Sequence, residues 1–172
     1  KPSKTGYIIA NEPNPKENVA DYNPANMKKL FRLVSHQDGE DFEKHYAVKI
    51  RLNGVATATN PYPTFDLKLV SIKDGTVLAE GSGLNLNEND TDNFIAAYFG
   101  DTRVSYNETT EKFETIGNYP KKNDYFYVEM HPDFKQAGPA AIPFGFFGPF
   151  KPSQFKITGL ATTTAAGSGS LE

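Results

Sequence analysis

Short stretches of alternating apolar and polar residues, each ending at a turn-forming dipeptide, constrain this chain most strongly. Residues 46–52 place an apolar side chain at every second position, and residues 65–69 repeat the pattern. Successive side chains of a strand point to opposite faces of a sheet, so a period of two predicts strands with one buried face. Asn53-Gly54 and Asp74-Gly75 both favour tight hairpin turns. The pattern predicts a mainly β fold rich in hairpins.

The remaining stretches extend this prediction. Strands are expected at Lys28–Ser35, at Val55–Thr59 as the partner of residues 46–52, at Thr76–Glu80, at Arg103–Tyr106 paired with Lys112–Ile116, and at Tyr125–Met130 paired with Gln154–Thr158. Helical crossovers of the kind that join parallel strands are missing, so antiparallel pairing is favoured. We expect an antiparallel sandwich or small barrel with one short helix.

That helix is predicted at about Asp90–Phe99. Asp90 can cap its first turn, and Gly100 fits the left-handed position after its last turn. Phe94, Ile95 and Tyr98 fall on one face at helical spacing.

The domain organisation follows from composition along the chain. Residues 1–27 contain Asn11-Glu12-Pro13-Asn14-Pro15 and Asn23-Pro24, which break regular structure and predict an N-terminal arm or loop. Residues 28–160 form the mainly β domain, either as one unit or as two sub-domains. Residues 161–172 end in Gly-Ser-Gly-Ser-Leu-Glu, typical of a flexible linker and a cloning scar. Since Lys1 is not a methionine, we expect a piece of a longer protein.

Composition argues against several classes of partner. The 172 residues carry a net charge of −3 without any block of like charge, whereas nucleic-acid and membrane-surface binding usually need a basic patch. No apolar run approaches the roughly 20 residues that span a bilayer. The chain has no cysteine, so it holds neither a disulfide nor a thiolate metal site. We expect no nucleic-acid partner and no membrane contact.

The search for chemical motifs finds no catalytic, cofactor-binding or metal-binding pattern. His36, Asp38 and Glu43 match no zinc spacing, and a solvated loop explains them better. The series Asn85, Asn87, Asn89, Asp90 resembles a calcium loop but lacks its turn glycine and its closing glutamate. Asparagine and aspartate at a helix entry bond the local backbone instead. We therefore expect a protein that is not an enzyme and needs no cofactor.

Aromatic residues are a further lead, with nine Tyr and thirteen Phe. An open sheet that stacks on sugars would present several aromatic rings side by side. The tyrosines that could supply them are Tyr7, Tyr22, Tyr62, Tyr119, Tyr125 and Tyr127. The other readings are a Phe core edged by Tyr, and use at an interface, where aromatic residues are enriched.

The run AAIPFGFFGPF at residues 140–150 is the most apolar part of the chain. Its prolines forbid a continuous helix, and its glycines permit tight backbone turns. Exposed, its large side chains would make an apolar patch that soluble monomers avoid. It therefore either packs against its own sheet, which the burial of large aromatics favours, or closes against a neighbouring domain or subunit. The candidate interface or core-closing residues are Ile142, Phe144, Phe146, Phe147 and Phe150.

The segment DNFIAAYFGDTRVSYNETTEKFETIGNYPKKNDYFYVEM, followed by IPFGFFGPF, resembles the tail sheath proteins of T4-like contractile-tailed phages. The order of parts carries the likeness: VLAEGSGLNLNENDTDNFI leads into a short helix, a Gly-Asp strand, an aromatic strand and an apolar passage. Upstream, FRLVSHQDGEDFEKHYAVKIRL and FDLKLVSIKDGTVLAEGSG are similar to strands of the sheath insert. The resemblance covers residues 28–160 and is strongest over 77–149.

This resemblance implies a structural role without catalytic residues. Sheath subunits assemble as stacked rings around a tail tube and contract during DNA delivery, with extra domains inserted toward the outside of the tail. The chain would be one or two of these inserted domains, located in the virion after assembly in the host cytoplasm. Its partners would be other sheath subunits and the tail tube, while the isolated fragment would be monomeric. Two other classes stay open: a β-sandwich module that binds carbohydrate or a host surface, and a glycosidase-type enzyme, which ranks last.

Replacing Phe146 and Phe147 with Ser separates the two readings of the apolar run. If these rings fill the core of the domain, thermal unfolding monitored by circular dichroism should show a lower Tm, because each loses buried apolar area. An unchanged Tm would contradict the core reading.

Overall fold

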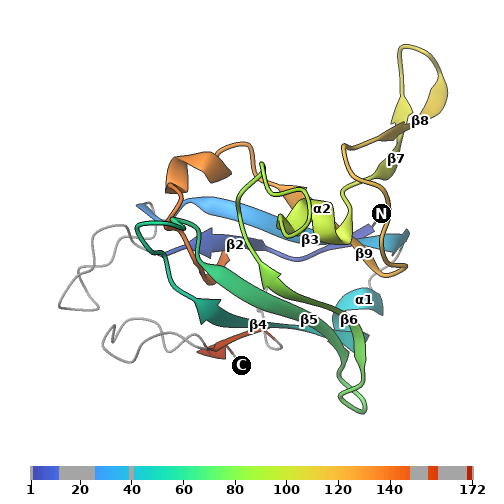
Figure 1. Ribbon diagram of the computed structural model, residues 1–172. Coiled ribbons are helices and arrows are strands. Elements are labelled where there is room, and N and C mark those ends of the chain that lie inside the picture. Colours follow the sequence, from blue (N-terminus) through green and yellow to red (C-terminus); the bar gives the residue numbers. More distant parts are fainter. Residues whose placement is uncertain (1, 12–25, 39–40, 148–154, 159–169, 172) are drawn as a thin grey trace.

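A computed structural model describes residues 2–11, 26–38, 41–147, 155–158 and 170–171, and it has two layers of β-sheet (Figure 1). The first sheet contains β1 (Pro2–Lys4), β2 (Tyr7–Ala10), β3 (Lys29–Asp38), β9 (Phe126–Met130) and β10 (Pro143–Phe147). The second sheet contains β4 (Tyr46–Gly54), β5 (Thr64–Ser71), β6 (Val77–Leu84), β11 (Phe155–Thr158) and β12 (Ser170–Leu171). The described strands form no closed barrel, so the predicted mainly β, antiparallel fold is confirmed as a sandwich-like arrangement.

A separate two-stranded ribbon, β7 (Arg103–Asn107) and β8 (Lys112–Ile116), projects from one end of the two layers (Figure 1). We call it the projecting hairpin. Three short helical pieces complete the described structure: α1 (Asp41–His45), α2 (Ile95–Phe99) and the 3₁₀ turn η3 (Phe134–Ala137). Across the described ranges, every helix falls short of the length and apolarity that a bilayer crossing requires.

Alternation along the strands builds the core between the layers. Phe31 and Leu33 of β3 point inward with no exposed surface, as do Leu67 and Leu69 of β5. Residues between them on each strand, such as Arg32, face outward and are half-exposed. This is the period-two pattern that the sequence predicts.

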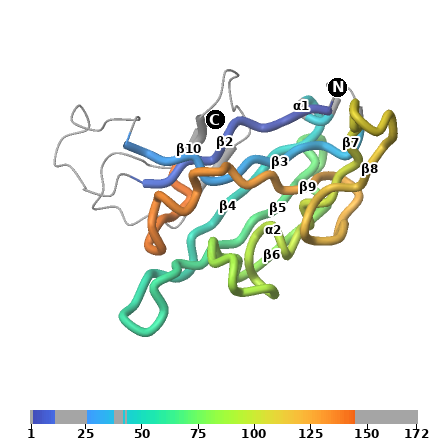
Figure 2. The backbone as a smooth tube through the Cα atoms, turned by 90° about the horizontal axis from the view of Figure 1, so that it is seen from above, coloured from blue at the N-terminus to red at the C-terminus, as the bar shows by residue number. Residues whose placement is uncertain are grey.

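The register of β3 explains the layout of the first sheet. Phe31 pairs with Ile8 of β2 and also with Met130 of β9, so these strands occupy opposite edges of β3. Val34 likewise lies between Lys4 of β1 and Tyr127 of β9. β1 and β2 thus follow each other along one edge of β3, and β9 runs along the other, as Figure 2 shows from above.

The expectation of an arm over residues 1–27 is therefore wrong for Pro2–Lys4 and Tyr7–Ala10, which are strands of the first sheet. The prolines that predicted the arm lie at residues 13, 15 and 24, outside the described residues. In the expected linker at 161–172, Ser170–Leu171 pairs antiparallel with β11, and the rest lies outside the described residues.

Two predicted strand partners are wrong. β4 pairs with β5 and not with residues 55–59, because residues 65–69 carry the apolar alternation that the core needs while Val55 is 82% exposed. β9 pairs with β3, and β11 pairs in parallel with β4, in place of the predicted β9–β11 pairing. Short-range turn signals do not encode which distant strands meet. The pairing of β5 with β6 across Asp74-Gly75 and that of β7 with β8 are confirmed.

The predicted helix at Asp90–Phe99 is shorter in the structure, where α2 spans Ile95–Phe99. Asp90 still caps a turn: its Oδ1 accepts from the backbone N–H groups of Asp92 and Asn93. The helix begins only at Ile95 because the backbone of Asn85 is hydrogen-bonded to the residues at and just before that point. Its N–H donates to the Asn93 carbonyl, and its own carbonyl accepts from the Ile95 N–H.

Two glycines test the role of backbone geometry. Gly100, after α2, has φ +88°, and a Cβ there would lie 2.4 Å from the Pro120 carbonyl oxygen, whereas Gly75 has φ +73° with open space around it. We expect Gly75→Ala to cost about 1–2 kcal/mol of unfolding free energy. Gly100→Ala should cost about 1–3 kcal/mol more, because a steric clash is added to the backbone strain. Urea unfolding measures both, and equal losses would contradict the proposed clash.

Candidate functional site

The projecting hairpin exposes the most concentrated group of large apolar side chains in the described chain. Val104 is 68% exposed, Tyr106 51% and Phe113 75%. In the register of the two strands Val104 lies opposite Thr115 and Tyr106 opposite Phe113, so all four share one face. The Tyr106 and Phe113 rings meet edge to face with centroids 5.2 Å apart. Cross-strand aromatic pairs stabilise a two-stranded ribbon.

Hydrogen bonds hold the base of the projecting hairpin. Asp101 Oδ1 accepts from the backbone N–H groups of Asn118, at 2.8 Å, and Tyr119, at 2.7 Å. The Thr102 hydroxyl donates to the Tyr119 carbonyl. Beside this point the Arg103 guanidinium carbon lies 5.8 Å from the centre of the Tyr127 ring. The Val128 N–H of β9 donates to the Gly100 carbonyl at 2.9 Å, so the hairpin is fixed to the first sheet and stands out from the body.

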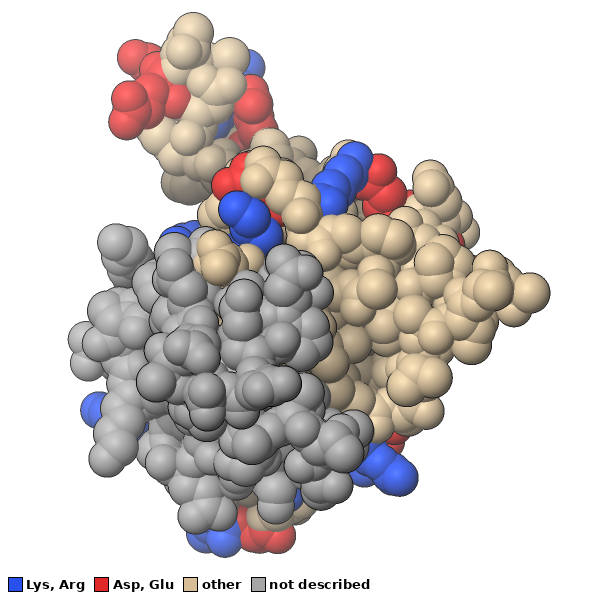
Figure 3. Space-filling model, turned by 90° about the vertical axis from the view of Figure 1, so that its left-hand side faces the viewer, with Lys and Arg blue, Asp and Glu red and all other residues tan. Residues whose placement is uncertain are grey.

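Acidic side chains border the apolar face. Glu108, Glu111 and Glu114 are all exposed, and Lys112 is the only basic residue between positions 104 and 115. In Figure 3 acidic residues, drawn in red, lie on both sides of this projection. Glu114 accepts hydrogen bonds from Asn107 Nδ2 and Thr110 Oγ1, at 3.0 and 3.1 Å. The hairpin therefore combines exposed apolar area with negative charge.

The side of the first sheet that faces away from the second sheet has the opposite character, and we call it the outer face. Arg32 lies at its centre, between Tyr7 of β2 and Glu129 of β9. The Arg32 guanidinium carbon is 4.5 Å from the centre of the Tyr7 ring, and Arg32 Nε donates to Glu129 Oε2 in an ion pair. The Lys29 ammonium nitrogen lies 5.7 Å from the same ring. Cations over aromatic rings are stabilised by the ring quadrupole.

Burial and charge shift the ionisation of this network. Burial raises the pKa of Glu129, but the hydrogen bond and positive charge of Arg32, with Lys4 and Arg103 nearby, outweigh it, and the pKa lies below its ordinary value of 4.5. Burial also raises the pKa of Tyr7 and Tyr127 above 10.0, against the lowering effect of the arginines. Glu129 is thus an anion at neutral pH, and both tyrosines are neutral.

His36 lies at one end of the outer face, with its ring centre 5.5 Å from that of Tyr127. Burial lowers its pKa below 6.5, with Lys121 acting in the same direction, so the ring is neutral at pH 7. Its Nε2 is buried and has no hydrogen-bond partner among the residues that the structure describes. Within the described ranges no three His, Asp or Glu side chains form a metal-binding group, and the side chains of Asp38 and Glu43 lie outside those ranges.

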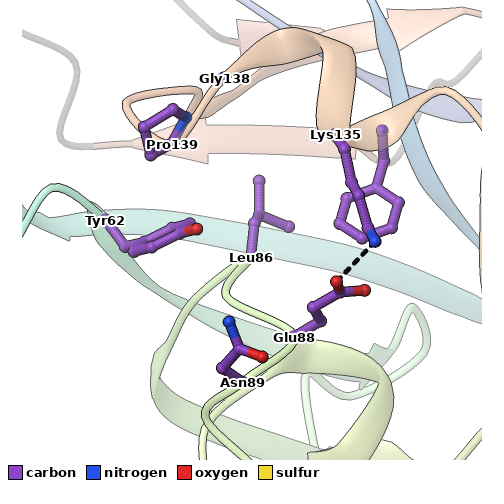
Figure 4. Close-up of a pocket in the computed structure, with 8 residues that line it drawn as sticks. Tyr62, Leu86, Glu88, Asn89, Lys135, Gly138 and Pro139 are labelled. Carbon is purple, nitrogen blue, oxygen red and sulfur yellow. Dashed lines mark ion pairs between the residues drawn. The ribbon is translucent and has the colours of Figure 1, made fainter.

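A shallow pocket of about 150 Å³ lies between the loop before α2 and the η3 turn (Figure 4). Its lining residues are Tyr62, Leu86, Glu88, Asn89, Phe134, Lys135, Gly138 and Pro139. The Lys135 ammonium and the Glu88 carboxylate bridge one side at 2.5 Å, and the Tyr62 ring lies on the other side with Asn89 beneath. An aromatic wall with amide and carboxylate groups suits a small polyhydroxylated ligand.

The structure does not gather the six tyrosines considered for a sugar-binding face. Tyr7 and Tyr127 lie on the outer face, whereas Tyr62 lines the pocket. The Tyr119 ring packs against Phe94 and the Tyr125 ring against Tyr46. Tyr22 lies outside the described residues. Distant strands carry these residues, so their spacing in the sequence does not predict their grouping.

The apolar run forms β10, which pairs with β2 at one edge of the first sheet as described. Ile142 and Phe144 are half-buried, and the Ile142 N–H donates to Asn11 Oδ1 at 3.1 Å. Phe146 and Phe147 pair by backbone with Ile8 and Tyr7. Their side chains, and the whole of Phe150, lie outside the described residues, so their use in core or interface stays a prediction.

The exposed hairpin face was not predicted, although the alternation of Val104 and Tyr106 with polar residues, and the isolated Phe113 in NETTEKFE, signalled it. Alternation predicts one apolar face but not whether a second sheet covers it.

Comparison of this chain with protein-family models, with curated proteins and with solved structures finds no match.

The Arg32–Glu129 pair makes stability depend on pH. The folded-state pKa of Glu129 is depressed, so its contribution is present above 4.5 and is lost as pH falls through the lower folded value. Glu129→Gln should reduce the free energy of unfolding at pH 7 by about 1–2 kcal/mol. The difference from the parent chain should shrink as the pH falls below 4.5. Urea unfolding across this range measures it.

Glu80→Gln is the matched control, because the Lys68–Glu80 pair is 3.5 Å long and both side chains are more than 40% exposed. Its effect should be small at every pH. A Glu129→Gln penalty that stays constant as pH falls would contradict the role of the pair.

Proposed function

We propose that this chain is an inserted, outward-facing domain of the sheath subunit of a contractile phage tail. In this role it is structural and has no catalytic activity of its own. The subunit assembles with further copies around the tail tube in the host cytoplasm, and the assembly contracts during DNA delivery. The virion is then its place of function.

The observation that carries the proposal is the exposed apolar face of the projecting hairpin. Clustered apolar side chains on a soluble surface mark contacts with other proteins. Val104, Tyr106 and Phe113 lie on a ribbon that no other described strand pairs with, and its base is anchored by Asp101. A projection of this kind suits a subunit that meets neighbours in an assembly.

The sequence resemblance to sheath proteins supports the same role. It is strongest over residues 77–149, the part of the chain that contains α2, the projecting hairpin, β9 and β10. The mainly β, two-layer body agrees with a domain whose contribution is shape and contact area.

Negative-stain electron microscopy of the full-length protein that carries this chain tests the proposal. Hollow, striated tubes or stacked rings are the expected result, because a sheath subunit assembles on itself. Dispersed particles at every salt concentration would contradict it. Deleting this domain should leave the tubes intact with a smaller outer diameter, since the domain lies on the outside.

A second candidate is a module that binds carbohydrate, and the pocket beside Tyr62 favours it. Aromatic rings stack on the apolar face of a sugar, while Asn89 and Glu88 can bind its hydroxyl groups. Calorimetric titration against a panel of glycans would show saturable binding for such a module. Tyr62→Ala should abolish it, and Tyr106→Ala, an exposed tyrosine on the hairpin, should not.

A further inference from the structure

We propose that the projecting hairpin of one copy binds the outer face of a second copy of this chain. The inference rests on the proposed function, in which the chain belongs to a self-assembling subunit. It adds the two surfaces that meet and the forces that join them. The hairpin contributes its apolar face and carboxylates, and the outer face contributes cations and aromatic rings.

Charge complementarity identifies the second copy as the occupant. Over residues 103–116 the three glutamates Glu108, Glu111 and Glu114 outnumber Arg103 and Lys112, which leaves the hairpin a charge of −1. Around Tyr7 on the outer face, the described side chains of Lys4, Lys29 and Arg32 lie with that of Glu129, and these four leave a charge of +2. Surfaces of opposite sign attract one another and select a partner during association. Each copy carries both.

The apolar parts of the two surfaces also match. Interfaces are enriched in tyrosine, phenylalanine and arginine at their centres. Tyr106 and Phe113 supply exposed rings on the hairpin, and Tyr7 with Arg32 supplies a stacked cation–ring pair at the centre of the outer face. A planar guanidinium stacks on aromatic rings. The Arg32 guanidinium of one copy therefore offers a surface on which the Tyr106 and Phe113 rings of the other copy can pack.

The hairpin is already held in a binding geometry. Asp101 and Thr102 tie both of its strands together at the base, and the Tyr106–Phe113 contact orders the apolar face. A preorganised element loses less conformational entropy on binding. The hairpin can therefore bind its partner without a coupled folding step.

The contact joins two different surfaces, so it is heterologous and can repeat from copy to copy into a ring or a row. A single two-stranded hairpin buries a small contact area. Weak, transient complexes typically bury less than about 1,200 Å² in total, and this contact belongs to that class. The isolated chain is then monomeric when dilute and associates at high concentration. In an assembly with many copies the same contact is strengthened by effective concentration.

Sedimentation velocity over a concentration series tests the contact in the isolated chain. The weight-average sedimentation coefficient should rise with protein concentration at about 0.02 M salt and rise less at about 0.5 M, because salt screens the charge attraction. Phe113→Ser should weaken association about tenfold or more. Its Tm should stay close to that of the parent, because this ring is 75% exposed. Val55→Ser, at a residue that is 82% exposed but outside the hairpin, is the matched control and should leave association unchanged.

Charge reversal identifies the receiving surface. Glu108→Lys with Glu111→Lys on the hairpin, and Lys4→Glu with Lys29→Glu on the outer face, should each reduce self-association. A mixture of the two variants should associate again, because the reversed hairpin now faces a reversed surface. Circular dichroism confirms that each variant is folded, and Phe113→Ser remains informative if the outer-face variant is not.

A sedimentation coefficient that is independent of concentration, or association that Phe113→Ser leaves unchanged, would overturn the inference. Failure of the mixed variants to associate would overturn the outer face as the receiving surface. The proposed function is tested separately by electron microscopy of the full-length protein. Tubes of the full-length protein together with an isolated chain that does not associate refute the inference alone, and association of the chain without any tubes refutes the proposed function alone.

Discussion

The contact between Phe31 of β3 and Phe65 of β5 joins the two layers on which the rest of the structure depends. The rings are stacked with centroids 6.3 Å apart and planes 9° from parallel, and each side chain is at most 1% exposed. Burying two such rings removes several hundred square ångströms of apolar area from water. Arg32 of β3 and Asp66 of β5, which follow these rings directly, then face outward, because side chains alternate along a strand. Packing of the core between the sheets thereby determines which residues lie on the outward-facing side of each sheet.

Arg32 illustrates this dependence. It follows Phe31 directly, so the burial of one ring places the guanidinium on the outer face, between Tyr7 and Glu129. The ion pair with Arg32 lowers the pKa of Glu129 and keeps its carboxylate charged at neutral pH. At the other end of β9, Tyr127 meets Arg103 at the start of the projecting hairpin. The basic outer face and the acidic hairpin are therefore adjacent, and they meet where Arg103 contacts Tyr127 of β9.

Local pattern predicted what depends on neighbours in the sequence. The strands over residues 46–54 and 64–71 and the turn at Asp74-Gly75 follow from alternation and turn chemistry. The turn predicted at Asn53-Gly54 fails because Asn53 is used otherwise: its side chain donates to Asp66 Oδ1 and accepts from the Thr64 hydroxyl. The helix before Gly100 is shortened because Asn85 takes the backbone groups that would have extended it. Long-range hydrogen bonds override both local signals.

The sequence by itself determined the mainly β class, the positions of most strands, the apolar run at β10 and the charge of the β7–β8 segment. These depend on residue type and spacing, which are local. Only the tertiary structure decided which strands pair, that residues 2–10 belong to the first sheet, and that Tyr7 and Arg32 share one face while Tyr62 lies at a pocket. It also decided that the hairpin remains uncovered. These features depend on contacts between residues far apart in the chain, which neither periodicity nor composition encodes.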